Sequence, residues 1–134
     1  GQYPPQRESL VSEQRPGHDI LVIDDDLAML ELLTSLLEDE GFAARAAASG
    51  ASGLAMMDEA PPALVLLDWM MPSMRGDEVL RAIRSGAHRD VPVVVLSASG
   101  DARSLLAEGA NEFLAKPFDI DELLACIARL LPTS

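Results

Sequence analysis

Several residue types and patterns are scarce in this sequence of 134 residues, and each scarcity excludes a class of protein. The single cysteine, Cys126, excludes an internal disulfide and suits a reducing compartment, so we expect a cytoplasmic location. Cys126 falls within a helical apolar pattern, which favours a buried structural thiol over a nucleophile. Two histidines, His18 and His88, fall in a linker-like stretch and a turn, where surface residues are expected rather than catalysts.

Basic residues and long apolar runs are also scarce. Ten Lys and Arg face 22 Asp and Glu, giving a net charge of −12. Nucleic acid is a polyanion whose binding needs clustered basic side chains, so we expect no direct nucleic-acid contact by this segment. The apolar runs at 63–67 and 91–96 are far too short to span a membrane, and no signal peptide is evident at the start. We therefore expect no membrane insertion.

The first 18 residues differ in composition from the rest. They contain three prolines, scattered charges and little apolar surface, which predicts a flexible N-terminal extension or linker. The chain opens on Gly1 rather than Met, which favours a fragment of a longer protein over a stand-alone one. Residues 19–132 are then expected to form one domain with a single continuous fold.

Two hydrophobic periods alternate along that domain. Short apolar runs predict buried strands at 20–23, 42–47, 64–67, 93–96 and 113–115, of which the alanine-rich second is the weakest. Helical spacing predicts helices between and after them, around 30–37, 51–59, 79–83, 102–108 and 120–131. Five strands alternating with five helices predict an α/β fold: a doubly wound parallel sheet between two helical layers.

Polar residues follow four of the five predicted strands: three aspartates at 24–26, then Asp68, Ser97 and Lys116. The carboxyl ends of parallel strands meet at one edge of a doubly wound sheet, so we expect these side chains to converge. Each has a purely structural interpretation as a helix cap, a turn residue or a solvated charge, and Asp26 is expected to be a cap. Their joint occurrence favours a functional site.

The predicted cluster has a definite chemistry. Neighbouring carboxylates repel one another, and a hard divalent cation relieves that repulsion. Oxygen donors without His or Cys favour Mg²⁺ over zinc. An aspartate beside Mg²⁺ can attack phosphorus, which makes Asp68 a candidate nucleophile, with Lys116 and Ser97 each placed to contact a phosphoryl oxygen.

Four stretches closely resemble the response-regulator receiver domains of bacterial two-component systems. They are LVIDDD at 21–26, LLDWMMP at 66–72 with Gly76, VLSA at 95–98 and AKPF at 115–118. The resemblance covers residues 19–131 with the motifs in order. It implies a flavodoxin-like fold of receiver (CheY-like) topology and a phosphoacceptor function.

The resemblance also implies the roles of individual residues. Asp68 matches the phosphoacceptor, and the acidic pair Asp24 and Asp25 matches the Mg²⁺ ligands, with Asp25 the more direct. The backbone carbonyl of Met70 matches the remaining protein ligand. Lys116 matches a lysine that is usually followed by a cis peptide bond to proline.

A conformational switch is implied as well. Ser97 matches a hydroxyl that turns toward the phosphoryl group, and Phe113 matches an aromatic ring that moves inward with it. The phosphoryl donor would be a histidine kinase or a histidine phosphotransfer protein, and the switch would signal to an output domain or partner. Such a domain is not an enzyme beyond its own phosphorylation and autodephosphorylation.

Two features depart from the family's usual pattern. Gly109 follows Ser97 by only twelve positions, which shortens the fourth helix and puts signalling or dimerisation through that face in doubt. Met70 and Ser99 occupy positions that tune dephosphorylation, and neither is suited to orienting a water molecule. We therefore expect a slowly decaying phosphoaspartate.

Two other functions stay open. Asp68 could be the nucleophile of a phosphatase, although such enzymes usually carry a second aspartate two positions later, where this chain has Met70. The chain could also be a binding module that keeps only the fold, although degenerate receivers typically lose an acidic ligand or the lysine.

Overall fold

The computed structural model describes residues 19–71, 74–98 and 102–131. The predicted extension at 1–18, its boundary with the domain, His18 and Ser99 lie outside these ranges. In the described part of the chain, five strands alternate with five helices. The α/β architecture expected from the sequence is therefore confirmed.

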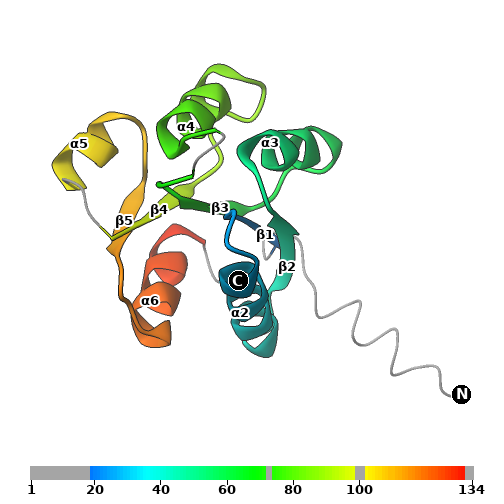
Figure 1. The fold of residues 1–134 in the computed structure, drawn as a ribbon, viewed down its shortest axis with the longest axis vertical. Coiled ribbons are helices and arrows are strands. Elements are labelled where there is room, and N and C mark those ends of the chain that lie inside the picture. Colours follow the sequence, from blue (N-terminus) through cyan, green and yellow to red (C-terminus); the bar gives the residue numbers. More distant parts are fainter. Residues whose placement is uncertain (1–18, 72–73, 99–101, 132–134) are drawn as a thin grey trace, which may run out of the picture.

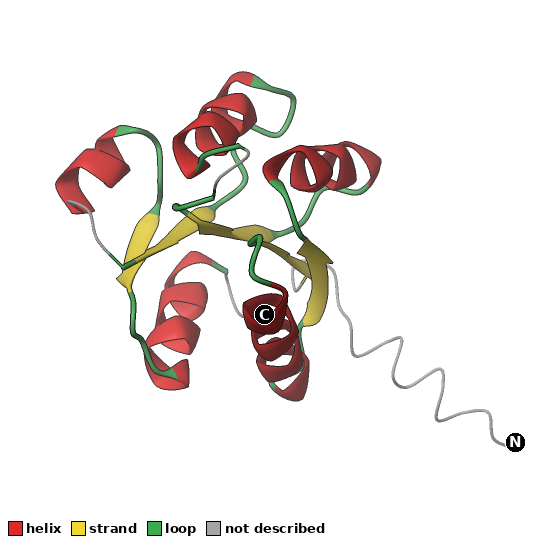
Figure 2. Cartoon of the chain, in the orientation of Figure 1, coloured by secondary structure: helices red, strands yellow, loops and turns green. Residues whose placement is uncertain are grey.

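One parallel sheet forms the centre of the fold, in the order β2-β1-β3-β4-β5. Figure 2 shows it as a middle layer with helices on both sides. The strands are β1 (Asp19–Ile23), β2 (Ala43–Ala47), β3 (Leu64–Asp68), β4 (Val93–Ser97) and β5 (Glu112–Ala115). The three inner strands are almost continuous apolar runs because helices cover both of their faces.

The helices form two outer layers (Figure 1). On one side of the sheet lie α2 (Leu27–Asp39) and α6 (Ile120–Leu130), and on the other lie α3 (Gly50–Glu59), α4 (Gly76–Ser85) and α5 (Ala102–Ala107). Each layer buries a separate apolar cluster against the sheet. Alternate residues of β1 enter opposite clusters, Ile20 and Val22 one and Leu21 and Ile23 the other, as the two-residue period of a strand requires.

The helix ends explain several of the predicted boundaries. Asp26 caps α2 by accepting hydrogen bonds from the N–H groups of Ala28 and Met29, as expected for this aspartate. After α2, Gly41 adopts φ +94°, a left-handed conformation that glycine reaches without a steric penalty. At α6, Asp119 and Glu122 form the predicted capping box.

Cys126 and the short helix also match the expectations. Cys126 is 2% exposed in α6, and burial is the main reason that the pKa of its thiol is raised. The helix between β4 and β5, α5, has six residues. None of the helices in the described ranges has the length and apolar character needed to cross a membrane.

Arg84, near the end of α4, ties the amino-terminal side of the sheet together. Its guanidinium donates to the carbonyl oxygens of Gly109 at 2.9 Å, Arg89 at 2.9 Å and Val91 at 2.7 Å. It also donates to Oδ1 of Asn111 at 2.7 Å. Burial lowers the pKa of Arg84, because the charged guanidinium loses part of its hydration in this position.

We expect Arg84→Ala to lower the free energy of unfolding by about 2–4 kcal/mol, because two partly buried carbonyl groups lose a charged donor. Urea denaturation measures the effect. The matched control is Arg81→Ala on the same helix, whose side chain is 66% exposed and forms only long ion pairs. The control should change stability by less than about 0.5 kcal/mol. Equal effects of the two substitutions would contradict this role for Arg84.

Candidate functional site

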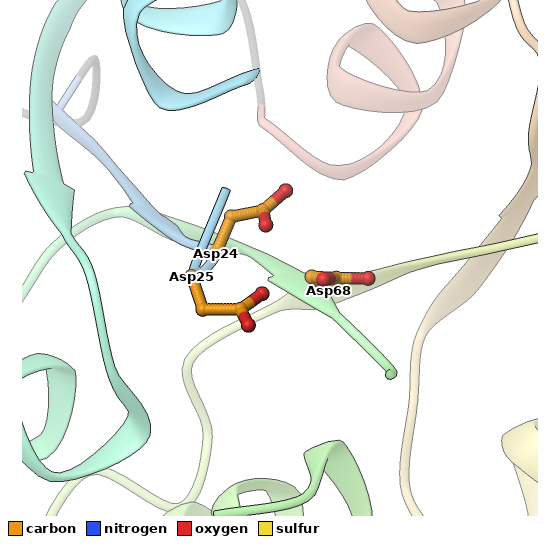
Figure 3. Close-up of side chains that lie close together, drawn as sticks. All are labelled: Asp24, Asp25 and Asp68. Atoms are coloured by element: carbon orange, nitrogen blue, oxygen red, sulfur yellow. The ribbon is translucent and has the colours of Figure 1, made fainter. Parts of the chain in front are cut away.

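Three carboxylates gather at the carboxyl-terminal edge of the sheet (Figure 3). Asp68 is the last residue of β3, while Asp24 and Asp25 follow β1, which is hydrogen-bonded to β3. Their nearest oxygens all lie within 4.8 Å of one another. The predicted convergence of these side chains is therefore present in the structure.

Asp24 is held in an unfavourable environment for a negative charge. Its side chain is almost fully buried, at 1% residue exposure. Oδ1 accepts a hydrogen bond from the N–H of Asp26 at 2.9 Å, but Oδ2 is buried without a hydrogen-bond partner. Burial, together with the nearby negative charge of Asp68, raises the pKa of Asp24 from 3.8 to about 6. A free, buried carboxylate oxygen beside two other carboxylates is a strong attraction for a cation.

Asp25 and Asp26 differ from Asp24 in exposure. Both are exposed, because β1 has ended and the chain turns outward into α2. Asp25 still contributes an oxygen to the cluster, whereas the Asp26 side chain serves as the α2 cap. The run of three aspartates thus divides into a buried acid, an exposed acid and a helix cap.

Lys116 supplies a positive charge to this edge. Its Nζ lies 3.2 Å from Oδ1 of Asp68, forming an ion pair in which Asp68 is 6% and Lys116 26% exposed. The main chain positions Lys116 through its N–H, which donates to the carbonyl oxygen of Ser97 at 2.9 Å. The following peptide bond, to Pro117, is cis, as the resemblance implied.

Ser97 and Phe113 lie on one face of the sheet. Ser97 ends β4 and is fully buried, and its neighbour on β5 is Ala115. Phe113 lies two residues before Ala115 and is paired with Val95. It is partly buried against the apolar cluster between the sheet and the layer formed by α3, α4 and α5. The two candidate switch residues therefore share the side of the sheet covered by α4 and α5.

Met70 lies next to the phosphoacceptor candidate. Its N–H is directed at Oδ1 of Asp68 at 3.4 Å, a long hydrogen bond, and its residue exposure is 65%. Trp69, between them, is held to β4 through its N–H, which donates to the carbonyl oxygen of Leu96 at 2.9 Å. Two hydrogen bonds thus hold the main chain after Asp68: one from Trp69 to β4, and the long one from Met70 to the Asp68 side chain.

The donor set fits Mg²⁺. It consists of carboxylate oxygens, one of them buried and unpaired, with no nitrogen or sulfur donor in the cluster. His88 lies elsewhere, with Nε2 3.6 Å from Oδ1 of Asp58. No histidine in the described ranges joins the acidic cluster.

A groove beside the site was not predicted. It has a volume of about 360 Å³ and runs between α2 and α6 up to Lys116; its lining includes Met29, Leu32, Leu36, Phe118 and Ile120. The sequence contained a signal for this groove. Besides the side of α2 that carries its buried leucines, Leu30, Leu33 and Leu37, the helix has further apolar residues. Leu32 is 52% exposed although it is large and apolar.

Comparison with known proteins agrees with this geometry. Residues 20–128 match the family described as the response regulator receiver domain. The chain is 42% identical over 115 residues to the DNA-binding response regulator MtrA of Mycolicibacterium paratuberculosis, covering 83% of this chain and 50% of MtrA. It is 38% identical over 122 residues to the nitrogen assimilation regulatory protein NtrX of Azorhizobium caulinodans, covering 87% of this chain and 27% of that protein.

Solved structures show the same fold. The receiver domain of NtrX from Brucella abortus superposes with a TM-score of 0.80 at 36% identity, covering 87% of this chain and all of that one. The chemotaxis protein CheY4 of Vibrio cholerae gives 0.79 at 28% identity, covering 84% of this chain and 98% of that one.

The chain spans half or less of the length of these curated relatives, so the match concerns their receiver portion. The five-stranded parallel fold agrees with that portion. The chain therefore belongs to the response regulator receiver domain family of two-component signal transduction.

Proposed function

We propose that this domain accepts a phosphoryl group on Asp68 in a Mg²⁺-dependent reaction and changes conformation in response. The observation that carries the proposal is the ion pair between Asp68 and Lys116 within a cluster of three carboxylates, two of them buried. This arrangement combines a nucleophile with positive charge and a place for a metal ion. It is also expensive to maintain without a function, because the carboxylates repel one another.

Asp68 would act as the nucleophile. One of its carboxylate oxygens forms the bond to phosphorus while the bond from phosphorus to the donor's imidazole nitrogen breaks, and that nitrogen keeps the electron pair. Because Asp68 is the last residue of β3, the sheet fixes its main chain. The ion pair with Lys116, whose Nζ lies 3.2 Å from Oδ1, orients its carboxylate. Such fixed placement accounts for much of the catalysis in phosphoryl transfer.

Lys116 would stabilise the charge on the transferred group. Its ammonium is already at the site, so no reorganisation is needed when phosphoryl oxygens arrive. Asp24, Asp25, Asp68 and the Met70 carbonyl would hold Mg²⁺. When bound, the metal supplies positive charge to the phosphoryl oxygens and cancels the mutual repulsion of the carboxylates.

Ser97 and Phe113 would form the switch. The Ser97 hydroxyl would turn toward the phosphoryl group, and Phe113 on the same face of the sheet would move inward. That face carries α4 and α5, so a change there would reach the surface beside these helices. The short α5 leaves little helical surface for an output partner, so we expect signalling through other elements as well.

The phosphoryl donor would be a histidine kinase or a histidine phosphotransfer protein. The apolar groove between α2 and α6 reaches Lys116, and α2 carries no basic residue while the first turn of α6 is acidic. An apolar helix flanked by basic residues would complement this surface.

Relatives such as MtrA are DNA-binding proteins about twice as long as the aligned region, so a DNA-binding output elsewhere in a longer protein is part of the proposal. The absence of direct nucleic-acid contact by the receiver residues, and a cytoplasmic location, stay predictions.

The proposal is tested by incubating the protein with MgCl₂ and acetyl phosphate, followed by intact mass measurement and assay of released phosphate. We expect a gain of at most one phosphoryl group per chain and no rapid turnover. Continuous fast release of phosphate would favour the phosphatase alternative instead. No mass gain with either acetyl phosphate or a phosphorylated histidine phosphotransfer protein would favour a binding module that keeps only the fold.

We expect the phosphorylated form to persist for minutes or longer. The Met70 side chain beside Asp68 is exposed but carries no group that accepts a proton from water or orients it for attack. The decay is followed by intact mass after the donor is removed. Met70→Glu, which adds a carboxylate at this position, is the comparison and should shorten the lifetime. Decay of the wild-type phosphoprotein within seconds contradicts the prediction.

A further inference from the structure

The first residue of α4, Gly76, lies directly against the main chain of Trp69, the residue after Asp68. The N–H of Gly76 donates to the carbonyl oxygen of Trp69 at 3.1 Å. A β-carbon added to Gly76 would lie 2.7 Å from Trp69 Cα, 2.9 Å from its carbonyl oxygen and 2.6 Å from Cε3 of the indole. Side chains essentially never approach main-chain atoms this closely, so any residue larger than glycine must displace Trp69 or α4.

Neither Trp69 nor α4 can move away from an added β-carbon without losing other contacts. Trp69 is held from the opposite direction by its hydrogen bond to Leu96 of β4, at 2.9 Å. The helix α4 is held by Val79 and Leu80, which are fully buried against the sheet. Displacing either partner therefore breaks a strand-to-strand contact or opens the packed core, which costs free energy.

A shift of the Trp69 main chain would also move its two chain neighbours, Asp68 and Met70. Met70 follows Trp69, and its N–H is directed at the Asp68 carboxylate at 3.4 Å. The Met70 carbonyl is also one of the proposed Mg²⁺ ligands. Both the metal position and the orientation of the Asp68 carboxylate thus depend on where the Trp69 main chain lies.

We propose that Gly76 is a positioning residue for the phosphoacceptor: the absence of its side chain lets α4 hold the main chain of Trp69, which sets the positions of Met70 and Asp68. This inference rests on the proposed function. It assigns to α4 a share in building the site, although α4 contributes none of the side chains predicted to act there.

The test compares Gly76→Ala with Gly86→Ala, the same substitution at the other end of α4. A β-carbon at Gly86 would lie 3.1 Å from the carbonyl oxygen of Ala82 and far from the site, so this control perturbs the helix alone. Three quantities are measured at a temperature where both variants are folded: the Mg²⁺ concentration that half-saturates Trp69 fluorescence quenching, the phosphorylation rate with acetyl phosphate, and the Tm in EDTA.

We expect Gly76→Ala to raise the half-saturating Mg²⁺ concentration about tenfold and to slow phosphorylation by about 10–100-fold. Gly86→Ala should keep wild-type Mg²⁺ binding and the wild-type phosphorylation rate. A folded Gly76→Ala protein with wild-type Mg²⁺ binding and rate overturns the inference and leaves the proposed function intact. A wild-type protein that neither binds Mg²⁺ nor gains a phosphoryl group overturns the proposed function, and the inference with it.

A measurement on the wild-type protein covers the case in which Gly76→Ala does not fold. Amide hydrogen exchange of Gly76 and Gly86 is followed by NMR with and without Mg²⁺. If the Gly76–Trp69 hydrogen bond is part of the metal site's support, Mg²⁺ should slow exchange at Gly76 severalfold more than at Gly86. Exchange at Gly76 that does not respond to Mg²⁺ also overturns the inference.

Discussion

The Asp24→Asn variant is expected to be more stable than the wild-type protein without Mg²⁺ and to bind Mg²⁺ far more weakly. Asp24 is buried with one unpaired oxygen and lies beside Asp68, so its ionised form is unfavourable in the folded state. An asparagine keeps an oxygen that can accept the Asp26 hydrogen bond but carries no charge. We expect a gain of on the order of 1–3 kcal/mol at pH 7, from the pKa of about 6 against 3.8 for an ordinary aspartate.

The same pKa predicts the pH dependence. Because the pKa of Asp24 is higher in the folded than in the unfolded state, the folded protein binds more protons between about pH 4 and pH 6. The stability of the metal-free wild type should therefore fall as the pH rises through that window, and this fall should be smaller in Asp24→Asn. Thermal unfolding in EDTA from pH 4 to pH 7 measures both effects.

Asp25→Asn is the matched control for Asp24→Asn. Asp25 belongs to the same carboxylate cluster but is exposed, so its replacement should weaken Mg²⁺ binding with little change in metal-free stability. Added Mg²⁺ should raise the Tm of the wild type and of neither variant, since only a bound ligand shifts the unfolding equilibrium. A metal-free Asp24→Asn protein less stable than the wild type would contradict this account of the cluster.

The Lys116→Met variant is expected to lose phosphoryl transfer while keeping the metal site. Removing the ammonium 3.2 Å from Asp68 takes away a charge that the phosphoryl oxygens would contact, and we expect phosphorylation to slow by about 100-fold. Methionine preserves much of the apolar stem that lines the neighbouring groove. Rates with acetyl phosphate, followed by intact mass, measure the effect.

Mg²⁺ binding should respond in the opposite direction. Without Lys116, the carboxylates lose the nearest positive charge, so Mg²⁺ should bind at least as tightly as in the wild type and the metal-free protein should be less stable. Lys116→Arg retains the charge with a different shape and should fall between the two in rate. A wild-type phosphorylation rate in Lys116→Met would exclude a role for this residue.

Much of the fold was predictable because its signals are local. The inner strands are apolar runs buried on both faces, and the helix ends are marked by residues whose backbone roles are specific, such as Asp26, Gly41 and Asp119. The site followed from topology, since parallel strands bring their carboxyl ends to one edge. The second strand, Ala43–Ala47, was the weakest signal because it lies at the sheet edge and needs little apolar surface.

Other features depend on distances that no local pattern encodes. In the run of three aspartates, which one is buried is decided by where β1 ends and α2 begins. The hydrogen bonds of Arg84 and the close contact of Gly76 with Trp69 join segments that only packing brings together. The groove between α2 and α6 arises from the spacing of two helices on the same face of the sheet.

The central claim is that Asp68 takes the phosphoryl group with the help of the surrounding carboxylates and Mg²⁺. The most direct test is the intact mass of the wild type and of Asp68→Asn after incubation with acetyl phosphate, each with MgCl₂ and with EDTA. We expect one added phosphoryl group in the wild type with MgCl₂ and none in the other three samples. A phosphoryl group of equal yield on Asp68→Asn, or on the wild type in EDTA, would contradict the account.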